Sequence, residues 1–248
     1  GHGPLGSVPL SVLVSAPPPK AMLRTPEDLA ATSFLVDRFA FASLAELSLF
    51  AWHRDKPPPP QRKARFLGVG APMLARSELT GSVRARSYDL AGGLDDKALA
   101  ELPKLPEAVD EMKALAGVFG EPNADLWLGP DAEERRFVGE RLRGYQTIAL
   151  ATHGFLPDEV ANVREASLML AIDSASKNRF DGILTSSEIA QLKLDADLVV
   201  LSACNTASAD NRPRAEAFTG LSQAFFTAGA RSLMVSHWPV MSGAAVQL

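Results

Sequence analysis

The sequence contains a single cysteine, Cys204, in a chain of 248 residues. An internal disulfide therefore cannot form, which indicates a reducing compartment such as the cytoplasm. The four histidines are not spaced like zinc ligands, so we expect no structural metal and no other cofactor. No apolar run approaches the length of a membrane span, and no signal peptide is visible.

Strong charge of one sign is also missing, since the formal net charge is only −4 and the two signs are mixed. Such mild acidity does not suit a nucleic-acid surface, so we expect neither a nucleic acid nor a membrane as partner. A phosphate-binding Gly-Lys-Ser/Thr loop and a Gly-x-Ser-x-Gly elbow are absent. Gly68-Val69-Gly70 is followed by Met73 where a dinucleotide fingerprint has its third glycine, so the signal for a dinucleotide-binding loop is weak.

Short apolar runs alternate with amphipathic stretches along most of the chain, which predicts βαβ units, an α/β fold and a mostly parallel sheet. Strands are expected at residues 65–69, 125–128, 146–151, 198–201 and 232–236. Helices are expected at residues 105–119, 131–142, 187–192 and 220–228. Two further runs, 167–172 and 182–185, have the pattern of a surface hairpin.

Composition divides the chain into segments. Residues 1–7 have no initiator methionine and resemble the remnant of an expression tag, so they are set aside. Residues 8–56 are expected to form an N-terminal appendage that packs on the core, with a strand at 34–41 and a helix at 44–52. The proline-rich residues 57–63 are then a stiff connector, and residues 64–248 are the core.

Cys204 follows an apolar run, Leu198 to Leu201, that is typical of a buried strand of a parallel sheet. Ligands of open α/β sheets bind outside the carboxyl ends of the strands. A lone thiol at that position is a candidate nucleophile. The alternative is a buried structural cysteine, because free cysteine is among the most buried residue types.

A histidine occupies the corresponding place after another run, where residues 146–151 lead into Thr152-His153-Gly154. A thiol needs a base near neutral pH, because the thiolate is the nucleophile. His153 is the candidate base, and the N–H groups of Gly154 and Cys204 are candidate oxyanion donors. The alternatives are that His153 only caps its strand, or that His237 is the base.

These motifs resemble the CHAT-domain family of caspase-like cysteine peptidases, which are related to separases and caspases. The likeness rests on Ala-Thr-His-Gly at 151–154, Leu-Ser-Ala-Cys-Asn-Thr at 201–206 and the tail at 229–240. The separation of His153 and Cys204, 204 − 153 = 51 residues, also suits a caspase-type order. The resemblance implies a caspase-like αβα sandwich in which Cys204 is the nucleophile, His153 the general base or acid, and Gly154 an oxyanion donor.

The residues that would select a substrate match the family less well. Relatives that cleave after basic residues often carry an acid two positions before the nucleophile, where this chain has Ser202. Separase-like relatives carry an Asp at the position that matches Ser242. Asp173 is a candidate replacement acid. The segment with His237 and Trp238 either lines the substrate groove or belongs to the core.

The resemblance thus implies a cysteine endopeptidase that hydrolyses protein or peptide substrates through an acyl-enzyme. In the family such a domain is often part of a longer chain with protein-binding repeats, and it usually continues with another helix beyond the position of Leu248, so we expect a truncated C-terminus. The residues alone leave two alternatives open. One is a catalytically silent interaction module, and the other is a thiol amidase or acyltransferase that acts on a small molecule.

Overall fold

The protein divides into two compact units, Gly1–Pro57 and Pro58–Leu248. The computed structural model describes residues 13–19, 22, 24–39, 64–72, 99, 102–139, 142–172, 180–202 and 218–235, without the side chains of 218 and 219. Within these residues, none of the helices is both long and apolar enough to span a membrane.

The first unit contains a short helix, α1 (Pro26–Ala30), and a 3-10 turn, η3 (Leu35–Asp37). The strand expected at 34–41 is wrong, because residues 35–37 form this 3-10 turn. The Asp37 carboxylate accepts a hydrogen bond from the Phe34 backbone N–H at 2.7 Å, and such a local side-chain bond competes with strand pairing. Phe34 forms an isolated antiparallel bridge with Val14. The helix expected at 44–52 lies outside the described residues.

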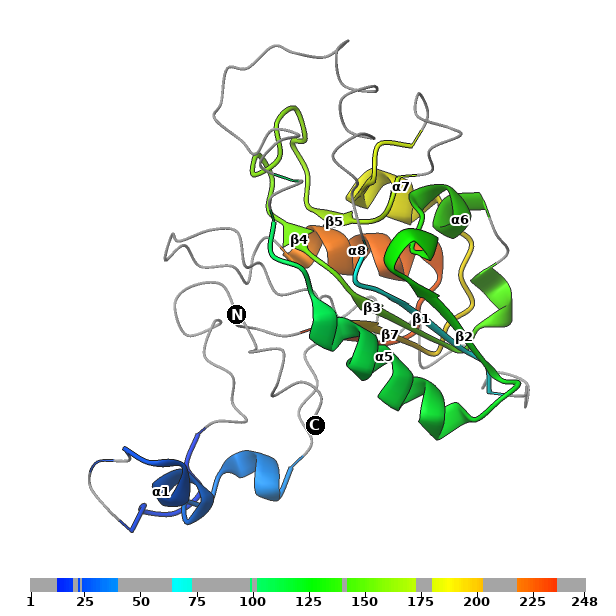
Figure 1. Ribbon diagram of the computed structural model, residues 1–248. Coiled ribbons are helices and arrows are strands. Elements are labelled where there is room, and N and C mark those ends of the chain that lie inside the picture. Colours follow the sequence, from blue (N-terminus) through cyan, green and yellow to red (C-terminus); the bar gives the residue numbers. More distant parts are fainter. Residues whose placement is uncertain are drawn as a thin grey trace. The chain divides into compact units, whose positions relative to one another are not determined.

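The second unit is built on a sheet whose described strands are all parallel (Figure 1). Its order is β2-β1-β3-β7-β8. The strands are β1 (Phe66–Gly70), β2 (Ala124–Leu128), β3 (Thr147–Ala151), β7 (Leu198–Leu201) and β8 (Leu233–Val235). The predicted α/β fold with a mostly parallel sheet is confirmed.

Helices cover both faces of this sheet, which makes the expected αβα sandwich (Figure 1). One face packs against α5 (Pro106–Phe119), which ends at Gly120 as expected. The other face packs against α6 (Glu134–Gly139), α7 (Ser186–Gln191) and α8 (Phe218–Ala228). Alternation along the strands explains both cores, since Ala149 of β3 faces α5 whereas Ile148 and Leu150 belong to the opposite cluster.

The predicted hairpin exists, but it is not on the surface. β5 (Ser167–Met169) pairs antiparallel with β6 (Ile183–Thr185), and β4 (Gly154–Phe155) completes a second, small sheet. Leu168 and Leu184 lie in the main core, while Met169 packs in a separate buried cluster with Phe155. Apolar side chains on both faces of these strands need cover on both sides, which is why the hairpin is buried.

The helix expected at 131–142 is not continuous where the structure describes it. Residues Gly129–Asp131 (η4) and Leu142–Gly144 (η5) are 3-10 turns, and α6 covers Glu134–Gly139. The chain before α6 is held by a parallel bridge between Glu133 and Ala171. The Ala171 N–H donates to Ala132 O at 2.7 Å, so the helix cannot begin before this pairing ends.

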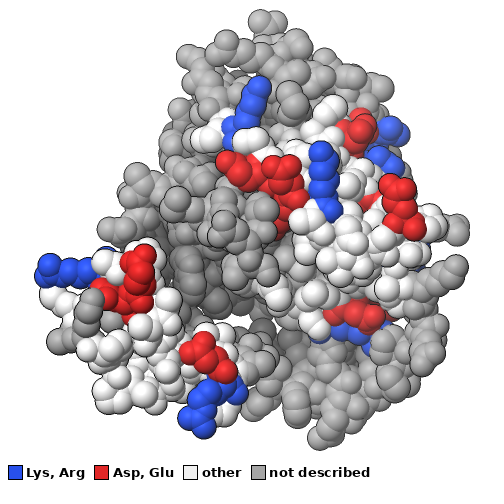
Figure 2. Space-filling model, turned by 60° about the horizontal axis from the view of Figure 1, so that its bottom comes forward, with Lys and Arg blue, Asp and Glu red and all other residues white. Residues whose placement is uncertain are grey.

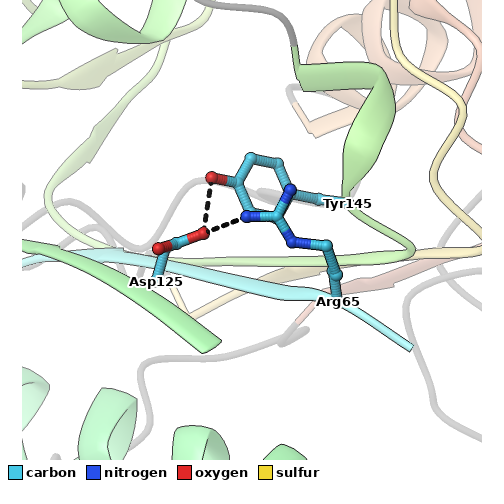
Figure 3. Close-up of polar contacts among 3 residues, drawn as sticks. All are labelled: Arg65, Asp125 and Tyr145. Carbon is cyan, nitrogen blue, oxygen red and sulfur yellow. Dashed lines mark hydrogen bonds and ion pairs between the residues drawn. The ribbon is translucent and has the colours of Figure 1, made fainter. Parts of the chain in front are cut away.

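Ion pairs tie the amino ends of the strands together. Arg65, which precedes β1, lies 2.6 Å from the Asp125 carboxylate of β2, and the Tyr145 hydroxyl donates to that carboxylate at 2.8 Å (Figure 3). Before β8, Arg231 pairs with Asp197 at 3.0 Å. On the face drawn in Figure 2, the described acidic and basic side chains are interspersed. Partly exposed pairs such as these contribute at most about 1 kcal/mol each.

Glu134 is a buried carboxyl at the start of α6, with 1% of its surface exposed. It accepts a hydrogen bond from the Gly182 N–H at 2.7 Å, and its own N–H donates to Ala171 O at 3.0 Å. Burial raises its pKa to about 8, and the charges of Asp181 and Glu188 act in the same direction. Glu134 therefore joins α6 to residues on both sides of the segment 173–179.

Gly229 ends α8 at φ +113°, and a Cβ there would lie 2.5 Å from the Leu194 carbonyl oxygen. We expect Gly229→Ala to reduce the free energy of unfolding by at least about 2 kcal/mol, from backbone strain and this clash. Gly117→Ala in the exposed interior of α5, where a Cβ meets nothing within 4 Å, should instead stabilise the protein by about 0.5–1 kcal/mol. Urea denaturation of both variants measures the difference, and equal effects would contradict this account.

The raised pKa of Glu134 makes stability depend on pH. Between the unfolded value of 4.5 and about 8, the folded state holds a proton that the unfolded state releases. The free energy of unfolding therefore falls as the pH rises, with a slope of at most about 1.4 kcal/mol per pH unit from this group. Glu134→Gln should lose this slope in urea denaturation from pH 5 to 8. Glu133→Gln, whose carboxylate lies 3.7 Å from Arg135, is the control that should keep it.

Candidate active site

The two strands that lead to the predicted histidine and cysteine are neighbours in the sheet. Thr147 of β3 pairs with Leu198 of β7, and Leu150 pairs with Leu201, so the register offset is 198 − 147 = 51 residues. Beyond the last pair, the Ser202 N–H still donates to Leu150 O at 2.9 Å. The offset equals the separation of His153 and Cys204 in the sequence, 204 − 153 = 51.

The same alternation decides which face of the sheet the strand ends present. In β3, Ala149 and Ala151 pack in the cluster on the α5 side, and in β7 Val200 does so. His153 follows Ala151 by two residues, and its ring contacts the segment that leads into α5. Ser202 follows Val200 by two residues, and its hydroxyl contacts α5 itself. The polar side chains that follow the two strands thus contact one stretch of chain, which consists of α5 and the segment before it.

His153 is buried, with 3% of its surface exposed, and it is held on two sides. Its Nε2 lies 2.9 Å from the Pro103 carbonyl oxygen, and its own carbonyl accepts the Met169 N–H at 2.8 Å. The neighbouring Thr152 hydroxyl donates to the Met169 carbonyl, which anchors the turn between β3 and β4. A carbonyl can only accept, so Nε2 carries the proton and Nδ1 carries the lone pair of the neutral ring.

Burial lowers the pKa of His153 below 6.5, and the Pro103 hydrogen bond opposes this shift with a smaller effect. The imidazolium form is disfavoured because its charge is poorly solvated in a buried site. The ring is therefore neutral at neutral pH, which is the form in which it can accept a proton. The arrangement suits a base whose tautomer is fixed by the protein.

Ser202 contacts an acid that the sequence analysis did not identify. Its hydroxyl donates to the Glu111 carboxylate of α5 at 3.0 Å, across 91 positions of sequence. Burial raises the pKa of Glu111, and the Ser202 hydrogen bond acts against that shift. A signal for Glu111 was present, because it shares the helical stripe of Ala108, Met112 and Leu115, where an apolar side chain is expected.

Of the residues predicted for the site, the structure describes His153, Gly154 and Ser202. Gly154 is buried and begins β4, where it pairs with Leu168. The remaining predicted residues are Cys204, Asp173, His237, Trp238 and Ser242, and they lie outside the described residues. Within the described part of the chain, no group of three or more His, Cys, Asp or Glu side chains is arranged to hold a metal ion. The Pro103 carbonyl was not predicted, because a backbone oxygen leaves no mark in the sequence.

Comparison with models of protein families gives a match. A family model, that of the CHAT domain, matches residues 2–248, so the match spans both compact units. No curated protein matches the chain.

The state of His153 can be tested by NMR of its ring nitrogens. We expect the neutral Nε2–H tautomer at pH 7 and a protonation midpoint below 6.5, because burial disfavours the charged ring. The histidines of the urea-unfolded protein provide the reference and should titrate near 6.5. An Nδ1–H tautomer, or a midpoint above the unfolded value, would contradict the assignment.

Proposed function

The chain belongs to the CHAT-domain family, which is related to caspase-like proteases, and on that premise we propose that it is a cysteine endopeptidase acting on protein or peptide substrates. The proposal rests on one observation above all. The register of β3 and β7 is offset by the same 51 residues that separate His153 from Cys204. The carboxyl ends of neighbouring parallel strands lie at the same edge of the sheet, and His153 and Cys204 each follow one of these two strands.

In the proposed mechanism, Nδ1 of His153 accepts the proton of the Cys204 thiol, and the thiolate attacks the carbonyl carbon of the scissile peptide bond. The N–H groups of Gly154 and Cys204 bind the resulting oxyanion. The C–N bond breaks as the imidazolium gives its proton to the leaving amine, which leaves a thioester. Water, deprotonated by His153, then hydrolyses the thioester and restores the thiol.

The surroundings of His153 support this role. A general base must be unprotonated at the working pH and must present its lone pair in a fixed direction. Burial keeps the ring neutral, and the Pro103 carbonyl holds the proton on Nε2. The ring does not need to reorient before it accepts a proton, which reduces the entropic cost of the first step.

Digestion of a peptide library tests the proposal, with Cys204→Ala as the nucleophile variant and His153→Gln as the base variant. We expect cleavage by the wild-type protein and a loss of at least about 1,000-fold in Cys204→Ala. His153→Gln should lower kcat by about 100- to 10,000-fold. His2→Gln is a matched control that should cleave at the wild-type rate.

Alkylation by iodoacetamide provides a second readout, which is unambiguous because the chain has one cysteine. His153→Gln should slow alkylation of Cys204 at pH 7, because the thiol then lacks its base. An effect confined to His237→Gln would assign the base to His237 and contradict the proposal. Normal folding without cleavage in any protein would favour the silent interaction module, and turnover of small amides or esters alone would favour a thiol amidase or acyltransferase.

A further inference from the structure

One short segment of the chain contacts both strand ends of the candidate site. The Pro103 carbonyl lies 2.9 Å from Nε2 of His153, and the Glu111 carboxylate lies 3.0 Å from the Ser202 hydroxyl. The two contact points are 111 − 103 = 8 residues apart, and α5 begins between them at Pro106. A shift of α5 relative to the sheet would therefore disturb both contacts together.

Glu111 occupies a position where packing alone favours an apolar residue. Its neighbours in the helical stripe, Ala108 and Met112, are buried against Phe66 and Ala149 of the sheet. Glu111 itself is half-buried between them, and this burial raises the pKa of its carboxyl. A polar group in such a place lowers stability relative to a well-packed apolar one. The hydrogen bond from the Ser202 hydroxyl is the interaction that a carboxylate provides at this position and an apolar residue would not.

Ser202 is fixed in two directions. Its N–H donates to Leu150 O of β3 at 2.9 Å, and its hydroxyl donates to Glu111 of α5. The helix approaches the sheet closely at this level, since a Cβ on Gly70 would lie 3.2 Å from Cγ of Met112. Ser202 is also only two residues before Cys204. The last described residue before Cys204 is therefore held by both the strand and the helix.

We propose that Glu111 is a positioning residue. Its hydrogen bond to Ser202 locks the end of β7 to α5 and thereby fixes the approach to Cys204 relative to His153. The segment before the same helix holds His153 through the Pro103 carbonyl. This inference rests on the proposed function. Glu111 acts through Ser202 and the helix.

Three substitutions test the proposal. Glu111→Ala and Ser202→Ala each remove the hydrogen bond, one from either side, and each should lower kcat by about 10- to 100-fold with little change in KM. Glu111→Gln retains an acceptor oxygen for the Ser202 hydroxyl and should restore most of kcat. The double variant Glu111→Ala/Ser202→Ala should be no slower than the slower single variant, because both remove one interaction. Asp110→Ala, at the exposed neighbouring position of α5, is the matched control.

Stability separates positioning from a structural role. Glu111 and Ser202 are both partly exposed, so water can replace their hydrogen bond, and the thermal midpoint of Glu111→Ala should stay close to that of the wild type although kcat falls. A parallel loss of stability and activity would overturn the proposal. If Glu111→Ala does not fold, Ser202→Ala, which removes a single oxygen, supplies the same test.

Two further outcomes are decisive. A rise in KM confined to substrates with Lys or Arg, with kcat unchanged, would make Glu111 a substrate-binding residue and overturn the proposal. Alkylation of Cys204 at pH 7 separates this proposal from the peptidase activity itself. Slower alkylation in Glu111→Ala and Ser202→Ala, with rescue in Glu111→Gln, would support positioning even if no peptide were cleaved. Unchanged alkylation in both alanine variants would overturn it.

Discussion

The parallel pairing of β3 with β7 is the constraint on which the rest of the second unit depends. Ile148 and Val199, which are paired in the ladder, are fully buried in the core on one face, and Ala149 is fully buried on the other. A slip of one residue would exchange the two faces and send each side chain into the wrong core. The register is therefore fixed by packing on both sides. The last paired residues, Leu150 and Leu201, are themselves 51 positions apart, so packing alone brings the ends of these two strands together at one edge of the sheet.

The two edges of the sheet carry different kinds of polar interaction. At the amino edge, Arg65, Asp125 and Tyr145 form a partly exposed cluster that joins the starts of β1, β2 and β3 (Figure 3). At the carboxyl edge, His153 is buried and Glu111 is half-buried, and burial shifts the pKa of each in the direction that disfavours its charged form. Solvated pairs add modest stability, whereas desolvated groups cost free energy. The polar groups whose burial lowers stability thus lie at the edge where a catalytic site is expected, and the partly exposed ion pair lies at the opposite edge.

Local pattern was a reliable guide where each element obeys its own periodicity. The helix that ends at Gly120 and the strand that ends at Ala151 lie close to their expected places, because their apolar stripes and faces are buried as the pattern requires. The expectations failed where a partner intervened. The Asp37 carboxylate accepts the Phe34 N–H, and a 3-10 turn forms where a strand was expected. Ala171 pairs with the residues just before α6, so that helix begins later than expected.

The sequence by itself determined the α/β class, the parallel sheet and the pair of motifs that end two of its strands, because these depend on residue type and spacing along the chain. Only the tertiary structure decided that the His153 ring donates to the Pro103 carbonyl, and that Glu111 receives the Ser202 hydroxyl. Those contacts join residues 50 and 91 positions apart. They exist because α5 packs against one face of the sheet, and no local periodicity records which helical residue will face which strand end.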